Sequence, residues 1–334
     1  MKIAVGMSGG VDSALAAALL IAQGHDVLGL TMQIWDGTVH LPSNGRSACY
    51  GPDEPQELEA VRAMAARLGI ERHTIPLADE YRTFVLDYFR SEYLAGRTPN
   101  PCVRCNRAMK FGFLLSKAHD MGLAFDRFAT GHYARVEQDA TTGRFLLKKG
   151  TDKSKDQSYF LAHLRQDQLG QALFPLGSWT KVQVREKARE LNLNDVADQP
   201  ESQDFLCCKS YAPLFEGLDI KPGPIVDRQG RVLGRHDGIV NYTIGQRKGL
   251  GLNGKKEPMY VIAIDAGKNT VVVGGQKDLF AQELVATGLN WIAINGLTKP
   301  ISATVRIRQQ HRDTPAVLSP MGAKDAVRVV FDAP

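Results

Sequence analysis

The stretch KIAVGMSGGVDSALAAALLIAQ, residues 2–23, decides the fold. Its first five residues form a short apolar run that ends in glycine, as expected of a buried parallel strand. Residues 13–23 are strong helix formers, and Gly24 marks the end of this helix. Glycines between a strand and a helix let backbone N–H groups face an anion, and the helix N-terminus adds positive potential. The stretch therefore predicts a phosphate-binding loop.

The alternation of strands and helices continues after this loop. Further strands are predicted at residues 27–34, 73–77 and 127–131. Further helices are predicted at residues 55–68, 81–94 and 111–121. Strands that alternate with helices indicate an α/β fold built on a parallel sheet.

The sequence changes character near Pro200, where turn signals begin to separate short β-rich runs such as PMYVIAID, residues 258–265. After about Gly267, three runs predict the strands of a small β domain: TVVVGG, ATVRIRQQ and AVRVVFDAP. We therefore expect three domains: a nucleotide-binding domain at residues 1–200, a small central domain at 201–265 and a C-terminal β-barrel at 266–334.

Composition limits the functional class. The chain has 334 residues, 43% hydrophobic and 23% charged, which is typical of a soluble globular protein. Five cysteines are too few for a disulfide scaffold, and no apolar run is long enough to span a bilayer, so we expect a cytoplasmic protein with no membrane partner. The net charge of +5 is compatible with binding to nucleic acid. The basic residues cluster in three places: Lys148, Lys149, Lys153 and Lys155; Arg247, Lys248, Lys255 and Lys256; Arg306, Arg308, His311 and Arg312.

The loop SGGVDS, residues 8–13, narrows the chemistry. It lacks the lysine of the mononucleotide P-loop and does not match the dinucleotide fingerprint. It resembles the loop of the N-type ATP pyrophosphatases, the PP-loop superfamily. The resemblance implies cleavage of ATP between its α and β phosphates and transfer of AMP to a substrate oxygen. The plainer alternative is a glycine-rich turn that Ser13 caps.

Several blocks of the chain resemble the tRNA-specific 2-thiouridylase family. The blocks are YLAGRTPNPCVRCNR (93–107), KFG (110–112), ATGHYAR (129–135), KDQSYFL (155–161), ESQD (201–204) and NYTIGQRKGL (241–250). The resemblance implies a PP-loop domain, a small central domain and a C-terminal β-barrel. It also implies that ATP and a protein sulfur donor, which supplies persulfide or sulfide, replace O2 of the wobble uridine of tRNA with sulfur.

The resemblance also implies roles for individual residues. The catalytic residues would be Asp12 and Cys105, the nucleophile, together with Cys102 and Cys207. ATP with Mg²⁺ would be bound by Gly6, Met7, Ser8, Gly9, Gly10, Val11, Asp12, Ser13, Met32 and Gly131. The tRNA and its flipped base would be contacted by Asn100, Pro101, Cys102, His132, Lys155, Asp156, Gln157 and Arg308.

The chain departs from the family pattern in three places. Many members have Asp at position 102, where this chain has Cys. The family's persulfide-carrying cysteine falls at position 206, which is Leu206 here, with Cys207 and Cys208 directly after it. The sequence stops at FDAP, residues 331–334, where the family usually continues, so we expect an incomplete barrel.

Four readings of the cysteines follow. Cys102, Cys105, Cys207 and Cys208 could bind zinc, but adjacent ligands are awkward, and a Cys102–Cys105 disulfide is disfavoured in the cytoplasm. The third reading is a persulfide relay through Cys105 and Cys207. The fourth is a [4Fe–4S] cluster held by Cys102, Cys105 and either Cys207 or Cys208. Cys49 is expected to be a bystander.

Two further expectations concern reactivity and function. Arg104 and Arg107 would lower the pKa of the neighbouring thiols and so favour the nucleophilic thiolate.

The alternatives to a tRNA thiolase are another adenylating PP-loop ligase and a non-catalytic tRNA-binding relic of the family. The first would need an ammonia-supplying domain, which the sequence does not show. The second gives no reason to keep the loop of residues 8–13 intact.

Overall fold

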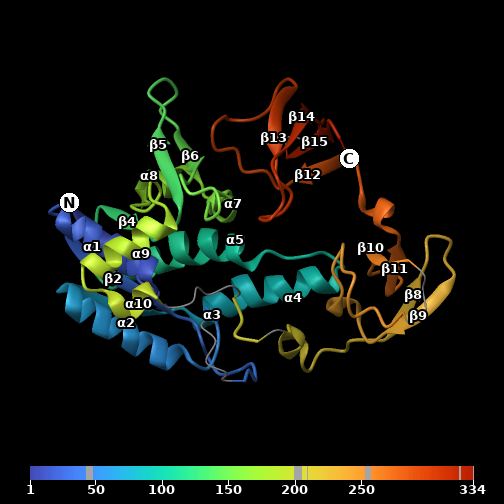
Figure 1. Cartoon of the computed structure of the whole chain (residues 1–334), viewed down its shortest axis with the longest axis horizontal. Helices are drawn as coiled ribbons and strands as arrows, with labels where there is room; N and C mark the ends of the chain where they lie inside the picture. The colour runs from blue at the N-terminus through green and yellow to red at the C-terminus, as the bar shows by residue number, and fades with distance from the viewer. Residues whose placement is uncertain (43–47, 199–204, 209, 253–256, 323–324, 334) are drawn as a thin grey trace. The chain divides into compact units, whose positions relative to one another are not determined.

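A computed structural model of the chain describes residues 1–42, 48–198, 205–208, 210–252, 257–322 and 325–333 (Figure 1). It divides into two compact units. The first comprises Met1–Val85, Pro101–Lys209 and Asn290–Asn295. The second comprises Leu86–Asn100, Ser210–Leu289 and Gly296–Pro334. Within the described residues, no helix has the length and apolar character needed to cross a membrane.

The first unit is built on a parallel sheet, as the sequence predicts. Its five strands lie in the order β3-β2-β1-β4-β7, and every neighbouring pair is parallel. Their bounds are β1 Lys2–Gly6, β2 Asp26–Gln33, β3 Glu71–Pro76, β4 Arg127–Ala129 and β7 Ala172–Leu173. The apolar runs found in the sequence therefore form strands of this sheet, with β1 buried in its middle and β3 at one edge.

Helices cover this sheet in the way that right-handed crossovers require. The chain moves outward from β1 through β2 to β3, and the intervening helices α1 (Val11–Ala22) and α2 (Glu54–Leu68) join one apolar core. Helix α9 (Lys181–Glu190) packs against α1 in the same core. On the return from β3 to β4, α6 (Leu114–Asp120) packs against β2 and β3.

The ends of α1 and α2 follow local sequence signals. Helix α1 begins at Val11, two residues earlier than predicted, so that Asp12 lies in its first turn. Helix α2 ends at Gly69, whose φ of 68° places it in the left-handed region that glycine adopts without strain.

Shorter elements complete the first unit. They are α3 Ala78–Tyr81, α5 Pro101–Cys105, η2 Asn106–Phe113, β5 Ala134–Gln138, β6 Phe145–Lys149, α7 Ser158–Leu161, α8 Gln166–Gln171 and α10 Asn194–Ala197. Strands β5 and β6 form an antiparallel hairpin. The π-helical segment η1 (Arg82–Leu86) follows α3, and η2 is also π-helical. Such π-helical turns are rare and frequent at functional sites.

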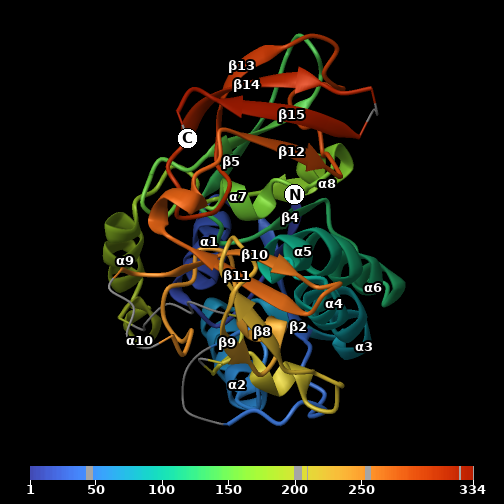
Figure 2. The ribbon, with the colours of Figure 1, turned by 90° about the vertical axis from the view of Figure 1, so that its right-hand side faces the viewer.

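The second unit contains one helix of two turns, α4 (Asp87–Leu94), and two four-stranded sheets. The first sheet has the order β10-β11-β8-β9, with β8 Gly223–Val226, β9 Val232–His236, β10 Tyr260–Asp265 and β11 Thr270–Gly274. The second is antiparallel, with β12 Glu283–Thr287, β13 Ile301–Val305, β14 Thr314–Pro320 and β15 Ala326–Phe331 (Figure 2). Short 3-10 turns are η3 Ala212–Phe215, η4 Ile239–Asn241 and η5 Gln276–Leu279.

One predicted strand lies in a different sheet from the one expected. TVVVG forms β11, which the sequence groups with the C-terminal strands, but it pairs with β10 and β8. The reason is local: a tight turn joins β10 to β11, so the two strands close as a hairpin.

Candidate active site

The predicted phosphate loop lies where this type of sheet binds ligands. The chain leaves β1 toward β2 on one side, and β4 returns to the other side of β1. The carboxyl ends of β1 and β4 therefore border a topological switch point, which is where open parallel sheets bind their ligands. Residues 7–10 join β1 to α1 at this point.

The loop has a fixed shape. The amide of Met7 donates to the carbonyl of Leu30 (2.8 Å), and Gly9 takes a φ of +80°. The Ser13 hydroxyl accepts from the amide of Ser8 (3.2 Å) and donates to the carbonyl of Gly10 (3.0 Å). Ser13 therefore closes the loop on itself. The helix N-cap is Gly10, which has no capping side chain, so Ser13 caps the glycine-rich turn and not the helix.

Two of the predicted nucleotide contacts lie at the same edge of the sheet. Gly131 follows β4, and a Cβ placed there would be 2.6 Å from the carbonyl carbon of Asp12, so only glycine allows this approach. Met32 lies near the carboxyl end of β2 and is half-buried. The structure thus brings both residues to the edge where the loop of residues 7–10 begins α1.

Asp12 has two partners that the sequence did not suggest. The ammonium group of Lys181 lies 2.8 Å from both of its carboxylate oxygens, and the hydroxyl of Tyr133 donates to Oδ1 at 2.8 Å. The Lys181 residue is only 7% exposed. Tyr133 belongs to the block ATGHYAR, which resembles the family, so the sequence pointed to its neighbourhood. Lys181 has no such signal, because it lies 169 residues from Asp12.

The two cysteines of the CVRC segment share one short helix. Cys102 and Cys105 lie on α5, which continues directly into η2. Burial raises the pKa of the Cys105 thiol to about 12, and the positive charge that opposes the rise comes from Lys110. The expectation that Arg104 and Arg107 lower this pKa is wrong, because desolvation of the thiolate outweighs the charges around it.

Cys49 acts electrostatically on this pair, although the sequence suggested a bystander. Its charge, like that of Cys102, raises the pKa of Cys105. All three cysteines also act on buried Tyr81, whose pKa is raised first by its burial and then by their charges. Tyr81 stacks on Tyr50 with ring centroids 5.4 Å apart.

Cys207 occupies different surroundings from Cys105. The amide of Tyr50 donates to the carbonyl of Phe205 (2.9 Å), and the buried Cys207 thiol donates to the carbonyl of Pro42 (3.4 Å). A Cβ on Gly51 would lie 3.2 Å from the Cys207 sulfur. Burial and the charges of its neighbours raise the pKa of Cys207. Those neighbours are Cys208, Asp53 and Glu57.

This arrangement bears on the two sulfur mechanisms. Over the described part of the chain, which includes all five cysteines, no three His, Cys, Asp or Glu side chains are placed to hold a metal ion. The [4Fe–4S] cluster therefore stays a prediction, as does the persulfide relay. The block ESQD, residues 201–204, lies outside the described residues.

The residues predicted to contact RNA differ in exposure. Lys155 and Gln157 are half-buried, and the Gln157 side chain accepts from the amide of Tyr133 (2.9 Å). Asp156 is only 3% exposed, and its carboxylate accepts from the amides of Gly150 and Ser158. Asp156 therefore shapes the loop that carries its two neighbours.

His132, another predicted RNA contact, directly precedes Tyr133 in the chain. Its ring nitrogen is 2.7 Å from the Thr130 hydroxyl, and burial followed by the charge of Lys110 lowers its pKa well below the usual value. Lys110 therefore acts on both His132 and Cys105, which places these two predicted residues in one neighbourhood.

The remaining predicted contacts lie on both units. Pro101 and Cys102 belong to the first unit, whereas Asn100 and Arg308 belong to the second. Arg308 is exposed and donates to the carbonyl of Ile244 (3.1 Å).

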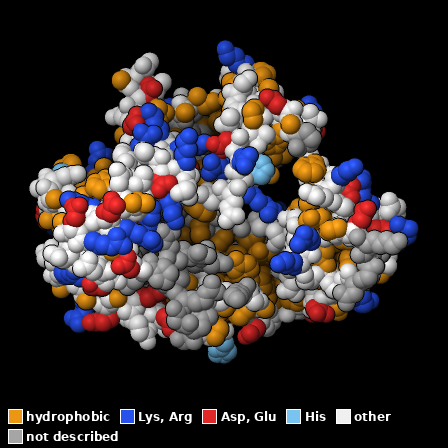
Figure 3. Space-filling model, in the orientation of Figure 1, with side chains coloured by type: hydrophobic (Ala, Val, Ile, Leu, Met, Phe, Trp, Pro, Cys, Tyr) orange, Lys and Arg blue, Asp and Glu red, His pale blue; other side chains and the backbone are white. Residues whose placement is uncertain are grey.

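Basic side chains gather on the visible face of the first unit, over the β5–β6 hairpin and α9 (Figure 3). On the hairpin they are Arg135, Lys148 and Lys149. Arg107 and Arg104 lie near His163, whose pKa is lowered by burial first and then by these two charges. Lys255 and Lys256, from the second predicted basic cluster, lie outside the described residues.

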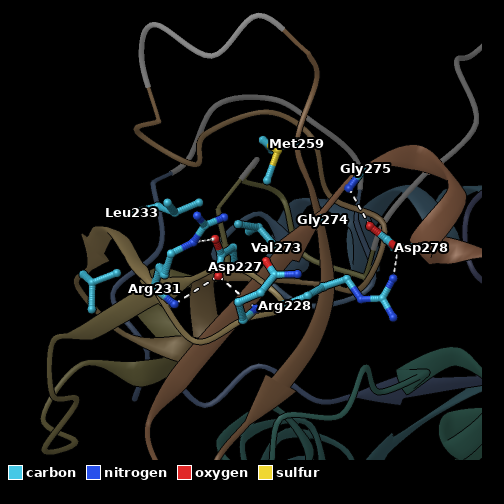
Figure 4. Close-up of a pocket in the computed structure, with 11 residues that line it drawn as sticks. Asp227, Arg228, Arg231, Leu233, Met259, Val273, Gly274, Gly275 and Asp278 are labelled. Carbon is cyan, nitrogen blue, oxygen red and sulfur yellow. Dashed lines mark hydrogen bonds and ion pairs between the residues drawn. The ribbon is translucent and has the colours of Figure 1, made fainter.

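The second unit has a cavity of its own, of about 660 Å³ (Figure 4). Its polar walls are two ion pairs, Arg231 with Asp227 and Arg228 with Asp278. Its apolar walls include Leu233 and Met259, and none of its lining residues is a predicted site residue.

The fold and the loop define a nucleotide-binding α/β protein with a glycine-rich phosphate loop at the switch point of its sheet. Residues 1–209 match the family model described as tRNA methyl transferase HUP domain, and residues 214–275 match the one described as tRNA methyl transferase PRC-barrel domain.

Curated relatives extend the match to the whole chain. A tRNA-specific 2-thiouridylase MnmA from Endomicrobium trichonymphae is 46% identical over 336 residues, which cover 100% of this chain and 92% of that protein. The protein of the same name from Acetivibrio thermocellus is 45% identical over 338 residues, with 100% and 92% covered. The chain belongs to the tRNA-specific 2-thiouridylase family.

Solved structures show weaker similarity. A 4-thiouridine synthetase–RNA complex with bound ATP superposes with a TM-score of 0.40 and 18% identity, over 64% of this chain and 45% of that one. A match at this level carries no inference about function.

Proposed function

We propose that this chain replaces O2 of the wobble uridine of tRNA with sulfur in an ATP-dependent reaction. The observation that carries the proposal is identity near 45% along the whole chain to relatives named tRNA-specific 2-thiouridylases. The phosphate loop with its Gly131 contact, and the CVRC helix, supply the residues that this chemistry needs. A tRNA substrate also implies the cytoplasm as the site of action.

The first step activates the base. The C2 carbonyl of uridine is a poor electrophile with a poor leaving group, so O2 attacks the α-phosphorus of ATP and pyrophosphate leaves. The loop amides of Gly9 and Gly10, with the N-terminus of α1, would hold the pyrophosphate. A Mg²⁺ ion would neutralise phosphate charge when bound. Asp12 could hold such an ion: its Oδ1 accepts from Tyr133 and Lys181, and its Oδ2 accepts from Lys181, which leaves acceptor capacity on Oδ2.

The second step installs sulfur. A sulfur nucleophile attacks C2, and the oxygen departs with AMP. Cys105 is the proposed nucleophile, but its pKa of about 12 means that the free protein holds it as a thiol at neutral pH. We infer that it becomes reactive only when the substrate fills the site, and that Lys110 supplies the positive charge that favours the thiolate.

The origin of the sulfur distinguishes two routes. In the relay, Cys207 or Cys208 receives a persulfide sulfur from a donor protein, and this outer sulfur attacks C2 as AMP leaves. The Cys105 thiolate would then attack the protein-bound sulfur and release thiouridine. The resulting disulfide between the two cysteines would be reduced by an external thiol. In the cluster route, Cys102, Cys105 and either Cys207 or Cys208 would have to come together, which they do not in this structure. No step is routed through a cluster, and we propose the relay as the working route.

Transcribed tRNA, α-labelled ATP and a sulfide or persulfide donor test the proposal directly. We expect AMP, pyrophosphate and 2-thiouridine in equal amounts, with thiouridine identified by mass spectrometry of digested tRNA. AMP without thiouridine under any sulfur supply would point to a different adenylating ligase. Binding of tRNA with no AMP at all would point to a non-catalytic relic.

A further inference from the structure

Two chains of hydrogen bonds join the predicted RNA-contact loop to the nucleotide loop. The first runs through Lys181. Its backbone amide donates to the side chain of Asp152 (3.0 Å), and its ammonium group donates to both carboxylate oxygens of Asp12 (2.8 Å each). The amide of Lys155 in turn donates to the carbonyl of Asp152 (3.1 Å). One residue of α9 therefore holds both loops.

The second chain runs through Tyr133. Its hydroxyl donates to Asp12 (2.8 Å). Its amide donates to the side chain of Gln157 (2.9 Å), and its carbonyl accepts from the amide of Gln157 (2.9 Å). The tyrosine is thus bonded at one end to the nucleotide loop and at the other end, through two bonds, to the RNA-contact loop.

Burial makes both links stiff. Tyr133 is 2% exposed and Lys181 is 7% exposed, and the ammonium group lies 5.7 Å from the centre of the tyrosine ring. The ion pair is partly buried, because the Lys181 side chain is 9% exposed and the Asp12 side chain 31%. Burying the ammonium group costs desolvation, and a buried ion pair is often no more stabilising than packed apolar residues of similar size. Stability alone therefore gives weak reason for a charged pair at this position, and its contact with Asp12 gives a functional one.

We propose that Lys181 and Tyr133 are positioning residues that fix Asp12 and make its position depend on the loop of residues 152–157, so that tRNA bound at Lys155 and Gln157 stimulates adenylation. This inference rests on the proposed function. A phosphate that contacts Lys155 shifts the loop, and the shift reaches Asp12 through Asp152 and Gln157. The consequence is that Asp12 takes its position for ATP cleavage only when tRNA is bound.

The coupling can be measured as the ratio of AMP formation with saturating tRNA to that without tRNA. In Tyr133→Phe the ring and both backbone bonds to Gln157 remain, and only the bond to Asp12 is lost. We expect this ratio to fall by about tenfold or more, the effect typical of losing one hydrogen bond to a charged group. Lys181→Met should lower the ratio similarly, and Lys181→Arg should restore part of it because the charge returns.

Lys187→Met is the matched control, because Lys187 lies on the same helix but its side chain is 38% exposed and pairs with Glu190. It should keep the wild-type ratio. If Tyr133→Phe and Lys181→Met slow both rates by one common factor, the residues are merely structural and the inference is overturned. If Lys181→Met fails to fold, Tyr133→Phe decides. Absence of AMP from the wild-type protein would instead contradict the proposed function, so the two failures are distinguishable.

Discussion

Replacing Gly10 with alanine separates the stability of the nucleotide loop from its function. Gly10 has φ −86° and ψ 162°, a conformation open to any L-residue, and its added Cβ would meet only the Ser8 hydroxyl oxygen, at 3.9 Å. Alanine is a poorer N-cap than glycine, but it also lowers the entropy of the unfolded chain. These effects are each about 0.5–1 kcal/mol and opposite in sign. The free energy of unfolding should therefore change by less than about 1 kcal/mol, and Tm by a few degrees at most.

The effect on catalysis should be much larger. A methyl group at position 10 takes the space where phosphate oxygens meet the loop amides. Each hydrogen bond to a charged group is worth about 1.5–3 kcal/mol, so losing two slows AMP formation by about 10²- to 10⁴-fold. Release of AMP from α-labelled ATP in the presence of tRNA measures this, and thermal unfolding checks the fold. A Gly10→Ala protein that forms AMP at the wild-type rate would refute the assignment of this loop.

Two further glycines make the comparison sharper. Gly296→Ala is the neutral control, because its Cβ would meet no atom within 4 Å and should leave both Tm and AMP formation unchanged. Gly131→Ala should lose both, because its Cβ would lie 2.6 Å from the backbone of Asp12 and must push α1 away. Crowding of this kind typically costs about 1–3 kcal/mol.

The remaining predictions concern RNA and sulfur. Affinity for tRNA should fall steeply with salt, and Lys155→Ala should lower the slope of log K against log salt by about 0.7–0.9, the value for one phosphate contact; an affinity independent of salt would remove the RNA assignment. Cys105→Ser should abolish thiolation. Cys102→Ser should keep part of the thiolation activity if the mechanism is a relay, and should lose both iron and activity if it is a cluster mechanism. Iron analysis after anaerobic reconstitution distinguishes the two. Single Ser substitutions of Cys207 and Cys208 should have unequal effects on thiouridine yield, with Cys207 the more severe; equal effects would contradict a single carrier. Alkylation of Cys105 in the free protein should accelerate about tenfold per pH unit from 7 to 10, because its pKa is about 12 and only the thiolate reacts; a plateau near pH 8 would contradict that pKa.

Much of the first unit could be predicted because its signals are local. A run such as residues 2–6 must be buried on both faces, and only a parallel sheet covered by helices offers that environment. Gly69 ends its helix because glycine adopts the left-handed conformation without strain. The strand order is not local, since it depends on which side of β1 the returning strand joins. The π-helical turns at residues 82–86 and 106–113 were missed for the same reason, because tertiary packing imposes them on ordinary helical sequence.

The site also has a part that local sequence predicts and a part that depends on tertiary contacts. The loop of residues 8–13 carries all its geometry within six positions, so its role follows from the sequence. The partners of Asp12 do not: Tyr133 is 121 residues away and Lys181 is 169 residues away. A lysine at the start of an amphipathic helix looks like any solvated charge until the fold buries it against a carboxylate. Burial also explains the wrong expectation for Cys105, because sequence shows the neighbouring arginines but not the loss of water that outweighs them.

The two cysteine groups have raised thiol pKa values for the same physical reasons. Desolvation is the largest cause for both Cys105 and Cys207, and the charges of different neighbours add to it. A thiol that is protonated and packed resists oxidation and stray alkylation, which protects an enzyme that uses two sulfurs. It also cannot attack carbon until its surroundings change. Both cysteines would therefore need a change in their surroundings before chemistry, and we propose bound tRNA as its source.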